Sequence, residues 1–194
     1  MEIALVQEVE LNESALVARA RDGDRQAFGE LVTRYMRRAY YVALGLVGSH
    51  DDALDLSQEA FARAYRARES LDPERPFYAW IYQIVRRLCF NHIRDRRTRF
   101  RRMELATPWL KEQAGVRAAA ADPGKEAERA ELRACLEAAI EELTDREREV
   151  LVLKEFEGLR YREIAELLAI PIGTVMSRLY SARRSLAEKL EDVL

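Results

Sequence analysis

The sequence predicts an all-α protein built from two small helical domains on a flexible linker, with a helix-turn-helix in the C-terminal domain. Three observations lead to this prediction. Glycine and proline are scarce, at 8 and 5 of 194 residues. Apolar residues recur at helical spacing almost everywhere. That spacing fails only from about residue 103 to 124, a gap longer than most loops inside one compact domain.

Three helices are expected in the N-terminal half. The stretch GSHDD (48–52) should end the first helix, and Ser49 with Asp52 can cap the second. The stretch LDPERP (71–76) separates the second helix from the third, because proline disfavours the α conformation in the residue before it. Their apolar faces can enclose one core. The expected core residues are Phe28, Leu31, Val32, Tyr35, Ala39, Val42 and Leu46, then Ala53, Leu56, Ala60, Phe61 and Ala64, then Phe77, Trp80, Ile81, Ile84, Leu88 and Cys89.

The middle of the chain is predicted to be a linker. MELATPWLKEQAGVRAAAADPGKE mixes Pro, Gly and Ala without a sustained apolar stripe. The expected organisation is therefore an N-terminal domain over 1–102, a linker over 103–125 and a C-terminal domain over 126–194.

Four shorter helices are expected in the C-terminal domain. Leu132, Leu136, Ile140 and Leu143 line the first. Thr144 and Glu147 form a capping box that opens the second, and Gly158 ends it. The third runs from Tyr161 to Leu168, with Ile164, Ala165 and Leu168 inward, and the fourth runs from Ile172 almost to the end of the chain.

The last two helices have the arrangement of a helix-turn-helix, which places the start of its second helix in the major groove of DNA. Val175, Leu179, Ala182 and Leu186 share one face of that helix and should pack on the domain. Small and polar residues followed by arginines suit contacts to phosphates and bases. Gly173 would let DNA approach closely, and the helix N-terminus offers free N–H groups. The candidate DNA-binding residues are Gly173, Thr174, Ser177, Arg178, Ser181, Arg183 and Arg184, and Tyr180 lies on the same face. An ordinary amphipathic helix with a solvated basic face is the alternative.

The C-terminal stretch resembles the DNA-binding domain of bacterial sigma factors of the extracytoplasmic-function (ECF) family. Their pattern is Leu-Pro-x-x-x-Arg, Glu-Gly-Leu-x-Tyr-x-Glu-Ile-Ala and Gly-Thr-Val-x-Ser-Arg-Leu. This chain matches it at Leu143, Arg148, Glu157 to Leu159, Tyr161, Glu163 to Ala165 and Gly173 to Leu179. It departs at Thr144, where proline is usual, and at Met176, where lysine is frequent. The resemblance implies that the last helix reads the promoter −35 element.

The N-terminal half also resembles this family, whose pattern there is Asp-Ala-x-Asp-Leu-x-Gln-Glu-x-Phe. The resemblance implies that the second helix docks on a coiled coil of the largest RNA polymerase subunit, and the acidic residues give it a polar edge suited to a basic partner. A solvated acidic face is the alternative. The expected polymerase-binding residues are Asp52, Asp55, Leu56, Gln58, Glu59 and Phe61, with Asp51 on the same edge.

The third helix resembles the family's −10-recognising helix. From Arg86 to Arg102 it carries eight arginines and one acid, Asp95. Aromatic side chains among arginines suit melted DNA, because bases stack on the rings while cations follow the backbone. The preceding loop, 68–76, matches by position the family's loop for a flipped-out base. A basic helix end that binds any polyanion is the alternative. The candidate −10 residues are Tyr82, Gln83, Arg86, Arg87, Phe90, Arg94 and Arg97, with Ala79 on the same outward face and Trp80 on the core side.

Composition narrows the function further. The chain has no apolar run of the roughly 20 residues that span a bilayer and no signal peptide, so a cytoplasmic location is expected. His50 and His92 have no partners at metal spacing, and Cys89 and Cys135 are expected to be buried thiols. No nucleophile–base constellation or phosphate loop is present. We therefore predict no enzyme activity, no metal and no cofactor.

The sequence thus predicts a sigma factor that binds core RNA polymerase and promoter DNA. The resemblance also implies control by an anti-sigma factor, and no small-molecule substrate or membrane insertion is expected. Two other functions stay open. One is a dimeric helix-turn-helix regulator that binds a palindromic operator by itself. The other is a helical interaction protein that has lost DNA binding.

Overall fold

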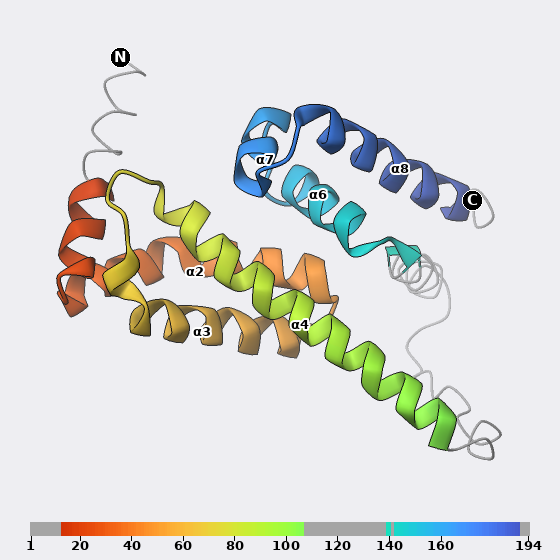
Figure 1. Ribbon diagram of the computed structural model, residues 1–194, viewed down its shortest axis with the longest axis horizontal. Coiled ribbons are helices and arrows are strands. Elements are labelled where there is room, and N and C mark those ends of the chain that lie inside the picture. Colours follow the sequence, from red (N-terminus) through yellow and green to blue (C-terminus); the bar gives the residue numbers. More distant parts are fainter. Residues whose placement is uncertain (1–12, 107–138, 141, 191–194) are drawn as a thin grey trace, which may run out of the picture. The chain divides into compact units, whose positions relative to one another are not determined.

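The computed structural model describes residues 13–106, 139–140 and 142–190, and its secondary structure elements there are all helices (Figure 1). The all-α prediction is confirmed. The chain divides into two compact units, one of Met1–Asn91 with Phe156–Gly158 and the other of His92–Glu155 with Leu159–Leu194. Among the described residues, none of the helices combines the length and apolar character that crossing a bilayer requires.

The first unit contains the first two helices that the sequence predicts, the start of the third as far as Asn91, and one further helix, over residues 13–21, that the sequence does not predict. Asp24 caps α2, because its side chain accepts hydrogen bonds from the N–H groups of Gln26 and Ala27 at 2.9 and 3.1 Å. The last helix continues through Ala106, so residues 103–106 of the predicted linker are helical, and most of that linker lies outside the described residues. The elements are α2 (Arg25–Val47), α3 (His50–Arg66), the short 3₁₀ helix η1 (Arg68–Ser70) and α4 (Phe77–Ala106).

A two-residue connection, Gly48 and Ser49, joins α2 to α3 within the GSHDD stretch where the sequence predicts the break. Gly48 adopts a left-handed conformation with φ 74°, and its N–H donates to the carbonyl of Leu44 at 2.9 Å. Ser49 then caps α3, since its hydroxyl accepts a hydrogen bond from the N–H of Asp52 at 3.3 Å. The turn brings α2 and α3 together as a helical hairpin.

The core of the first unit follows the predicted apolar faces with five exceptions. Phe28 of α2 meets the ring of Tyr65 edge-on at 5.1 Å and that of Phe77 at 6.5 Å, which ties all three helices together. Five expected core residues, Val32, Tyr35, Leu56, Trp80 and Ile84, are only half-buried. The expected core residues that are buried are Phe28, Leu31, Ala39, Val42, Leu46, Ala53, Ala60, Phe61, Ala64, Phe77, Ile81, Leu88 and Cys89.

The second unit contains α6 (Asp145–Glu155), α7 (Tyr161–Leu168) and α8 (Ile172–Leu190). Figure 1 shows α6 and α7 on the same side of α8, and both helices pack against it. The predicted bounds of α7 are confirmed, and Gly158 takes a left-handed φ of 66° in the turn after α6. The predicted helix through Leu132 and Leu136 lies almost wholly outside the described residues.

Two glycines of α2 and its turn should respond to alanine in opposite directions. Gly48→Ala should destabilise the protein by about 1 kcal/mol, because a Cβ is strained at its positive φ. Gly29→Ala should stabilise it by roughly 0.5–1 kcal/mol, because Gly29 lies inside the helix, where an added Cβ would meet open space. Urea unfolding followed by circular dichroism measures both. Equal effects of the two substitutions would contradict the left-handed turn at Gly48.

Cys89 should behave as an inert core thiol. It is fully buried, and burial raises the pKa of its thiol to about 12. In a Cys135→Ser variant, which leaves Cys89 as the sole cysteine, a thiol reagent such as DTNB should react slowly with the native protein and rapidly in denaturant. Fast labelling of the native variant would contradict the burial.

Candidate nucleic-acid interface

The turn between α7 and α8 spans three residues and has the geometry of a helix-turn-helix. Ala169 adopts a left-handed φ of 52°, and the next N–H, that of Ile170, donates to the carbonyl of Ala165 at 3.0 Å. The N–H of Thr174 donates to the carbonyl of Pro171 at 2.9 Å as α8 begins. These bonds end one helix and start the next within a single tight reversal, as the sequence predicts.

One face of α8 is buried and holds the helix in place. Val175, Leu179 and Ala182 are at most 2% exposed, and Ile164 of α7 is fully buried. The fourth predicted core position, Leu186, is only half-buried. The packing face is therefore confirmed over the first three turns of the helix.

The start of α8 is open on another face. Gly173 and Ser177 are exposed, and Thr174 and Arg178 are half-buried at the border of this face. A Cβ at Gly173 would meet nothing within 4 Å, so internal packing does not require glycine there. The hydroxyl of Ser177 donates to the carbonyl of Thr174 at 3.1 Å and keeps its lone pairs available to a partner. This open start agrees with the predicted approach of a large partner.

Two arginines of α8, Arg183 and Arg184, are exposed and paired with exposed carboxylates. Arg183 pairs with Glu155 and Arg184 with Glu188, each at 2.7 Å, and the arginine side chains are 51% and 67% exposed. Exposed ion pairs contribute about 0–1 kcal/mol, so a phosphate can replace these carboxylates at small cost. Both residues thus remain candidates for DNA contact.

Ser181 does not lie on the open face, which corrects the prediction for its side chain. Its hydroxyl donates to Oε1 of Glu147 on α6 at 2.5 Å. The other oxygen of Glu147, Oε2, accepts from the N–H of Thr144 at 3.0 Å, and Thr144 Oγ1 accepts from the N–H of Glu147 at 3.3 Å, which confirms the capping box. One carboxylate therefore caps α6 and binds α8.

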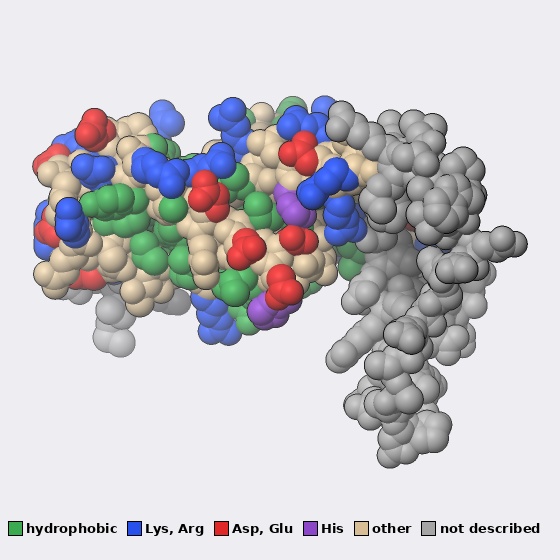
Figure 2. Space-filling view, turned by 90° about the horizontal axis from the view of Figure 1, so that it is seen from below, with side chains coloured by type: hydrophobic (Ala, Val, Ile, Leu, Met, Phe, Trp, Pro, Cys, Tyr) green, Lys and Arg blue, Asp and Glu red, His purple; other side chains and the backbone are tan. Residues whose placement is uncertain are grey.

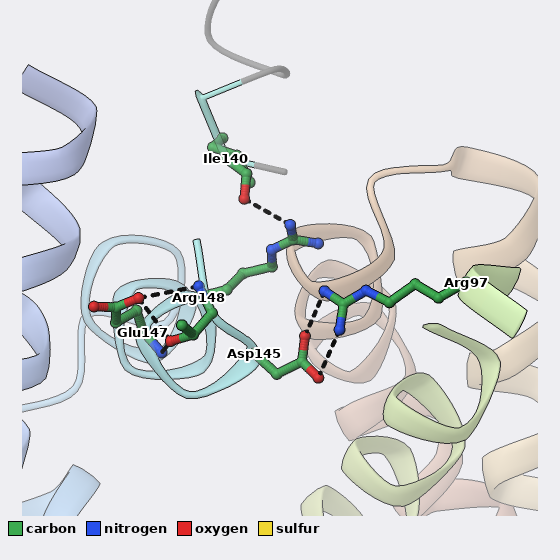
Figure 3. Close-up of polar contacts among 6 residues, drawn as sticks. Arg97, Ile140, Asp145, Glu147 and Arg148 are labelled. Carbon is green, nitrogen blue, oxygen red and sulfur yellow. Dashed lines mark hydrogen bonds and ion pairs between the residues drawn. The ribbon is translucent and has the colours of Figure 1, made fainter. Parts of the chain in front are cut away.

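Arg148, which the family pattern singles out, plays a structural part here. It is 6% exposed, and its Nη2 donates to the carbonyl of Ile140 at 2.6 Å (Figure 3). The guanidinium binds the carbonyl of a residue just before α6, which helps to fix the chain that enters the helix.

The predicted −10 residues of α4 divide into exposed and buried ones. Gln83, Arg87 and Arg94 lie at the surface or its border, and the guanidinium of Arg86 lies over the ring of Phe90 at 5.0 Å. Tyr82, in contrast, is 2% exposed, so its prediction as an outward residue is wrong. Tyr82 follows the buried Ile81 in the helix and so lies at the edge of the face that packs in the core, which is why its side chain is buried. Arg97 is 54% exposed and pairs with Asp145 at 2.9 Å (Figure 3), and Ala79 is half-buried.

The predicted polymerase-binding residues form an edge along α3, with one exception. Asp55 and Gln58 are exposed, and Asp52 and Leu56 are half-buried. Glu59 pairs with Arg63 at 2.7 Å, and this bond lowers the pKa of its carboxyl. Phe61 is 4% exposed and belongs to the core, because it lies on the helix face that packs on α2. Figure 2 shows Asp and Glu side chains interspersed with Lys and Arg on the face that it draws.

The site prediction does not include three exposed apolar residues of α8. Ile172, Met176 and Tyr180 are 42%, 52% and 71% exposed. They recur every four residues, so they share one side of the helix. Val175, Leu179 and Ala182 already form the buried face of α8. The second set of apolar residues at four-residue spacing is therefore not needed for packing, and the sequence alone could have revealed it as an exposed apolar stripe.

Glu147 should make the stability of the second unit depend on acid pH. Hydrogen bonds from Ser181 and then Thr144 lower the pKa of its carboxyl below the usual 4.5. A lowered folded-state pKa stabilises the protein above the unfolded pKa, and this stabilisation is lost as pH falls through the folded pKa. Glu147→Gln should therefore destabilise the protein by about 1 kcal/mol at pH 7 and flatten the loss of stability below pH 4.5. Urea unfolding across pH 2–7 measures this, with Glu188→Gln, which changes only an exposed pair, as the control. An unchanged pH profile in Glu147→Gln would contradict the double role of Glu147.

Two protein families match this chain, one in each half. The family described as Sigma-70 region 2 matches residues 31–99, and the family described as Sigma-70, region 4 matches residues 133–186. Among solved structures, CnrH in complex with the cytosolic domain of CnrY is similar with a TM-score of 0.66 and 26% identity, over 93% of this chain and 97% of that one.

Curated relatives extend the similarity along nearly the whole chain. The RNA polymerase sigma-H factor of Pseudomonas aeruginosa is 33% identical over 181 residues, which cover 92% of this chain and 94% of that protein. The ECF RNA polymerase sigma-E factor of Escherichia coli strain K12 is 32% identical over 187 residues, 95% of this chain and 97% of the relative. With a helix-turn-helix at one end and a helical region 2 at the other, this chain belongs to the ECF family of RNA polymerase sigma factors.

Proposed function

We propose that this sigma factor uses three separate surfaces to place RNA polymerase on its promoters. A sigma factor binds core RNA polymerase and directs promoter-specific initiation, and the family consists of transcription regulators rather than enzymes. The proposal assigns the open start of α8 to the −35 duplex, the outer side of α4 to the melted −10 strand and the edge of α3 to the polymerase. The observation that carries it is the open, partly basic start of α8.

The −35 duplex would be bound by the first turns of α8. Gly173 leaves room for the backbone to approach DNA, and Thr174, Ser177 and Arg178 offer donors and acceptors to base edges or phosphates. Arg183 and Arg184 would exchange their exposed carboxylate partners for phosphates. Ser181 is outside this set, because it holds α8 on α6.

The melted −10 strand would be bound along α4. Gln83, Arg87 and Arg94 are exposed and spaced by about one and two helical turns, so they lie along one side of α4. Arg86 stacked on Phe90 gives a flat, positively charged platform of the kind on which bases stack. A surface that prefers unpaired bases shifts the melting equilibrium by its differential affinity for the open state.

Core polymerase would be bound along α3, through the side chains of Asp55, Gln58 and Glu59. Exposed carboxylates favour a basic partner through charge complementarity. Leu54, which is 41% exposed on the same helix, adds an apolar contact that the sequence prediction did not include.

We also propose control by an anti-sigma factor and action in the cytoplasm. The support is the similarity to CnrH, whose solved structure contains the cytosolic domain of CnrY as its partner. A protein that covers the DNA-binding or polymerase-binding surfaces would hold the sigma factor inactive until it is released.

Run-off transcription with purified bacterial core polymerase and a promoter library tests the proposed function. Addition of this protein should yield discrete transcripts from a subset of promoters. Arg178→Ala with Arg184→Ala should weaken holoenzyme binding to a selected promoter about 10-fold or more, since each lost base or phosphate contact costs about 1–3 kcal/mol. Arg21→Ala with Arg25→Ala removes the same charge outside the three surfaces and should leave binding unchanged.

Two results would count against the proposal. No transcripts together with no binding to core polymerase would overturn it, and specific binding of a palindromic duplex by the protein alone would favour the dimeric regulator. Unchanged promoter affinity in the α8 double variant would overturn the assignment of the −35 surface.

A further inference from the structure

The exposed apolar residues of α8 form a stripe beside the proposed −35 surface. Among the described residues, the large apolar side chains that are exposed are Tyr41, Leu54, Phe156, Ile172, Met176 and Tyr180, and the last three lie on α8. Their spacing of four residues aligns them along the helix, and Met176 is the middle member. The stripe is separate from the buried face of Val175 and Leu179.

The stripe borders groups suited to DNA. Met176 directly precedes the exposed Ser177 and lies one turn from the exposed Gly173, so both neighbours leave its side chain accessible. Arg183 and Arg184 follow within about one turn of Tyr180. An apolar stripe flanked by cations is complementary to a surface that combines negative charge with a few apolar groups.

We propose that Met176 reads a thymine of the −35 element by packing on its C5 methyl group. The methyl is the apolar group that a base pair presents in the major groove. A thioether lacks an N–H and a charge, so it cannot donate to a base acceptor or pair with a phosphate. Burial against the methyl is the favourable contact left to it. The inference rests on the proposed −35 role of α8 and makes Met176 a specificity-determining residue.

DNA is favoured over a protein partner by the charge around the stripe. Arg183 and Arg184 follow the stripe within about one turn of Tyr180, and Gly173 and Ser177, which are exposed near Met176, are small. A docked protein helix would have to match this basic surround with its own acids, whereas the phosphates of DNA supply that charge on both sides of the groove.

Deoxyuridine substitution tests the proposal, because it removes the thymine methyl and leaves base pairing intact. The measurement is the affinity of the holoenzyme for a promoter selected by run-off transcription, with each thymine of the −35 element on either strand replaced in turn. The wild type should lose about fourfold at one or two positions, the factor expected for burial of one methyl-sized group. Met176→Ala should bind thymine and deoxyuridine equally at those positions.

Matched variants separate the methyl contact from general loss of affinity. Met176→Leu should retain most of the discrimination, because it keeps an apolar side chain of similar volume. Arg183→Ala should weaken binding to the thymine promoter and to its deoxyuridine version by the same factor, because it removes a charge and not an apolar contact. The ratio of the two affinities should therefore stay as in the wild type.

The outcomes also separate this inference from the proposed function. A holoenzyme that transcribes the promoter but binds every deoxyuridine-substituted promoter as tightly as the original overturns the role of Met176. The same holds if Met176→Ala loses as much affinity on deoxyuridine substitution as the wild type does, or if the selected −35 element contains no thymine. If Met176→Ala weakens capture of an anti-sigma protein but not thymine discrimination, the stripe is a protein-docking surface and the proposal is wrong. A holoenzyme without promoter-dependent transcription overturns the proposed function itself.

Discussion

The candidate interface depends on the burial of one face of α8. Val175, Leu179 and Ala182 pack against α6 and α7, and this burial fixes the rotation of α8 about its own axis. The hydrogen bond from Ser181 to Glu147 adds a directional contact at the edge of that face. Because the helix cannot turn, Gly173 and Ser177 stay on the solvent side, where a partner can reach them. The packing of the buried face of α8 therefore determines which of its residues are exposed.

The helices with a regular apolar period and the helix ends marked by a capping residue were predicted correctly from the sequence. The bounds of α7, the cap at Ser49 and the capping box of Thr144 with Glu147 all follow from local spacing and are confirmed. The helix over 13–21 was missed, because nine residues make only about two and a half turns, too few for the apolar residues Leu16, Val17 and Ala20 to show a helical period.

Side chains at the edge of a helical face were harder to predict than the helices. Tyr82 is buried although the spacing predicts it outward, and Ser181 bonds Glu147 although the spacing predicts it on the DNA side. Each lies near a boundary between two faces, where a shift of some tens of degrees decides which neighbour the side chain meets. Phe61 matches a polymerase-binding pattern and is a core residue. A sequence motif shows that a residue type is needed at a position. It does not show whether that residue contacts the partner or only packs inside the protein to hold the contacting helix in place.

The two-residue connection between α2 and α3 bears on the order in which the chain folds. Gly48 and Ser49 close a helical hairpin whose contacts are local in sequence, so its formation requires little loop-closure entropy. During synthesis this hairpin leaves the ribosome before α7 and α8 have been translated, and domains generally fold as units from the N-terminal end. The edge of α3 that we propose binds the polymerase can therefore be structured while the helix that we propose reads DNA is still being made.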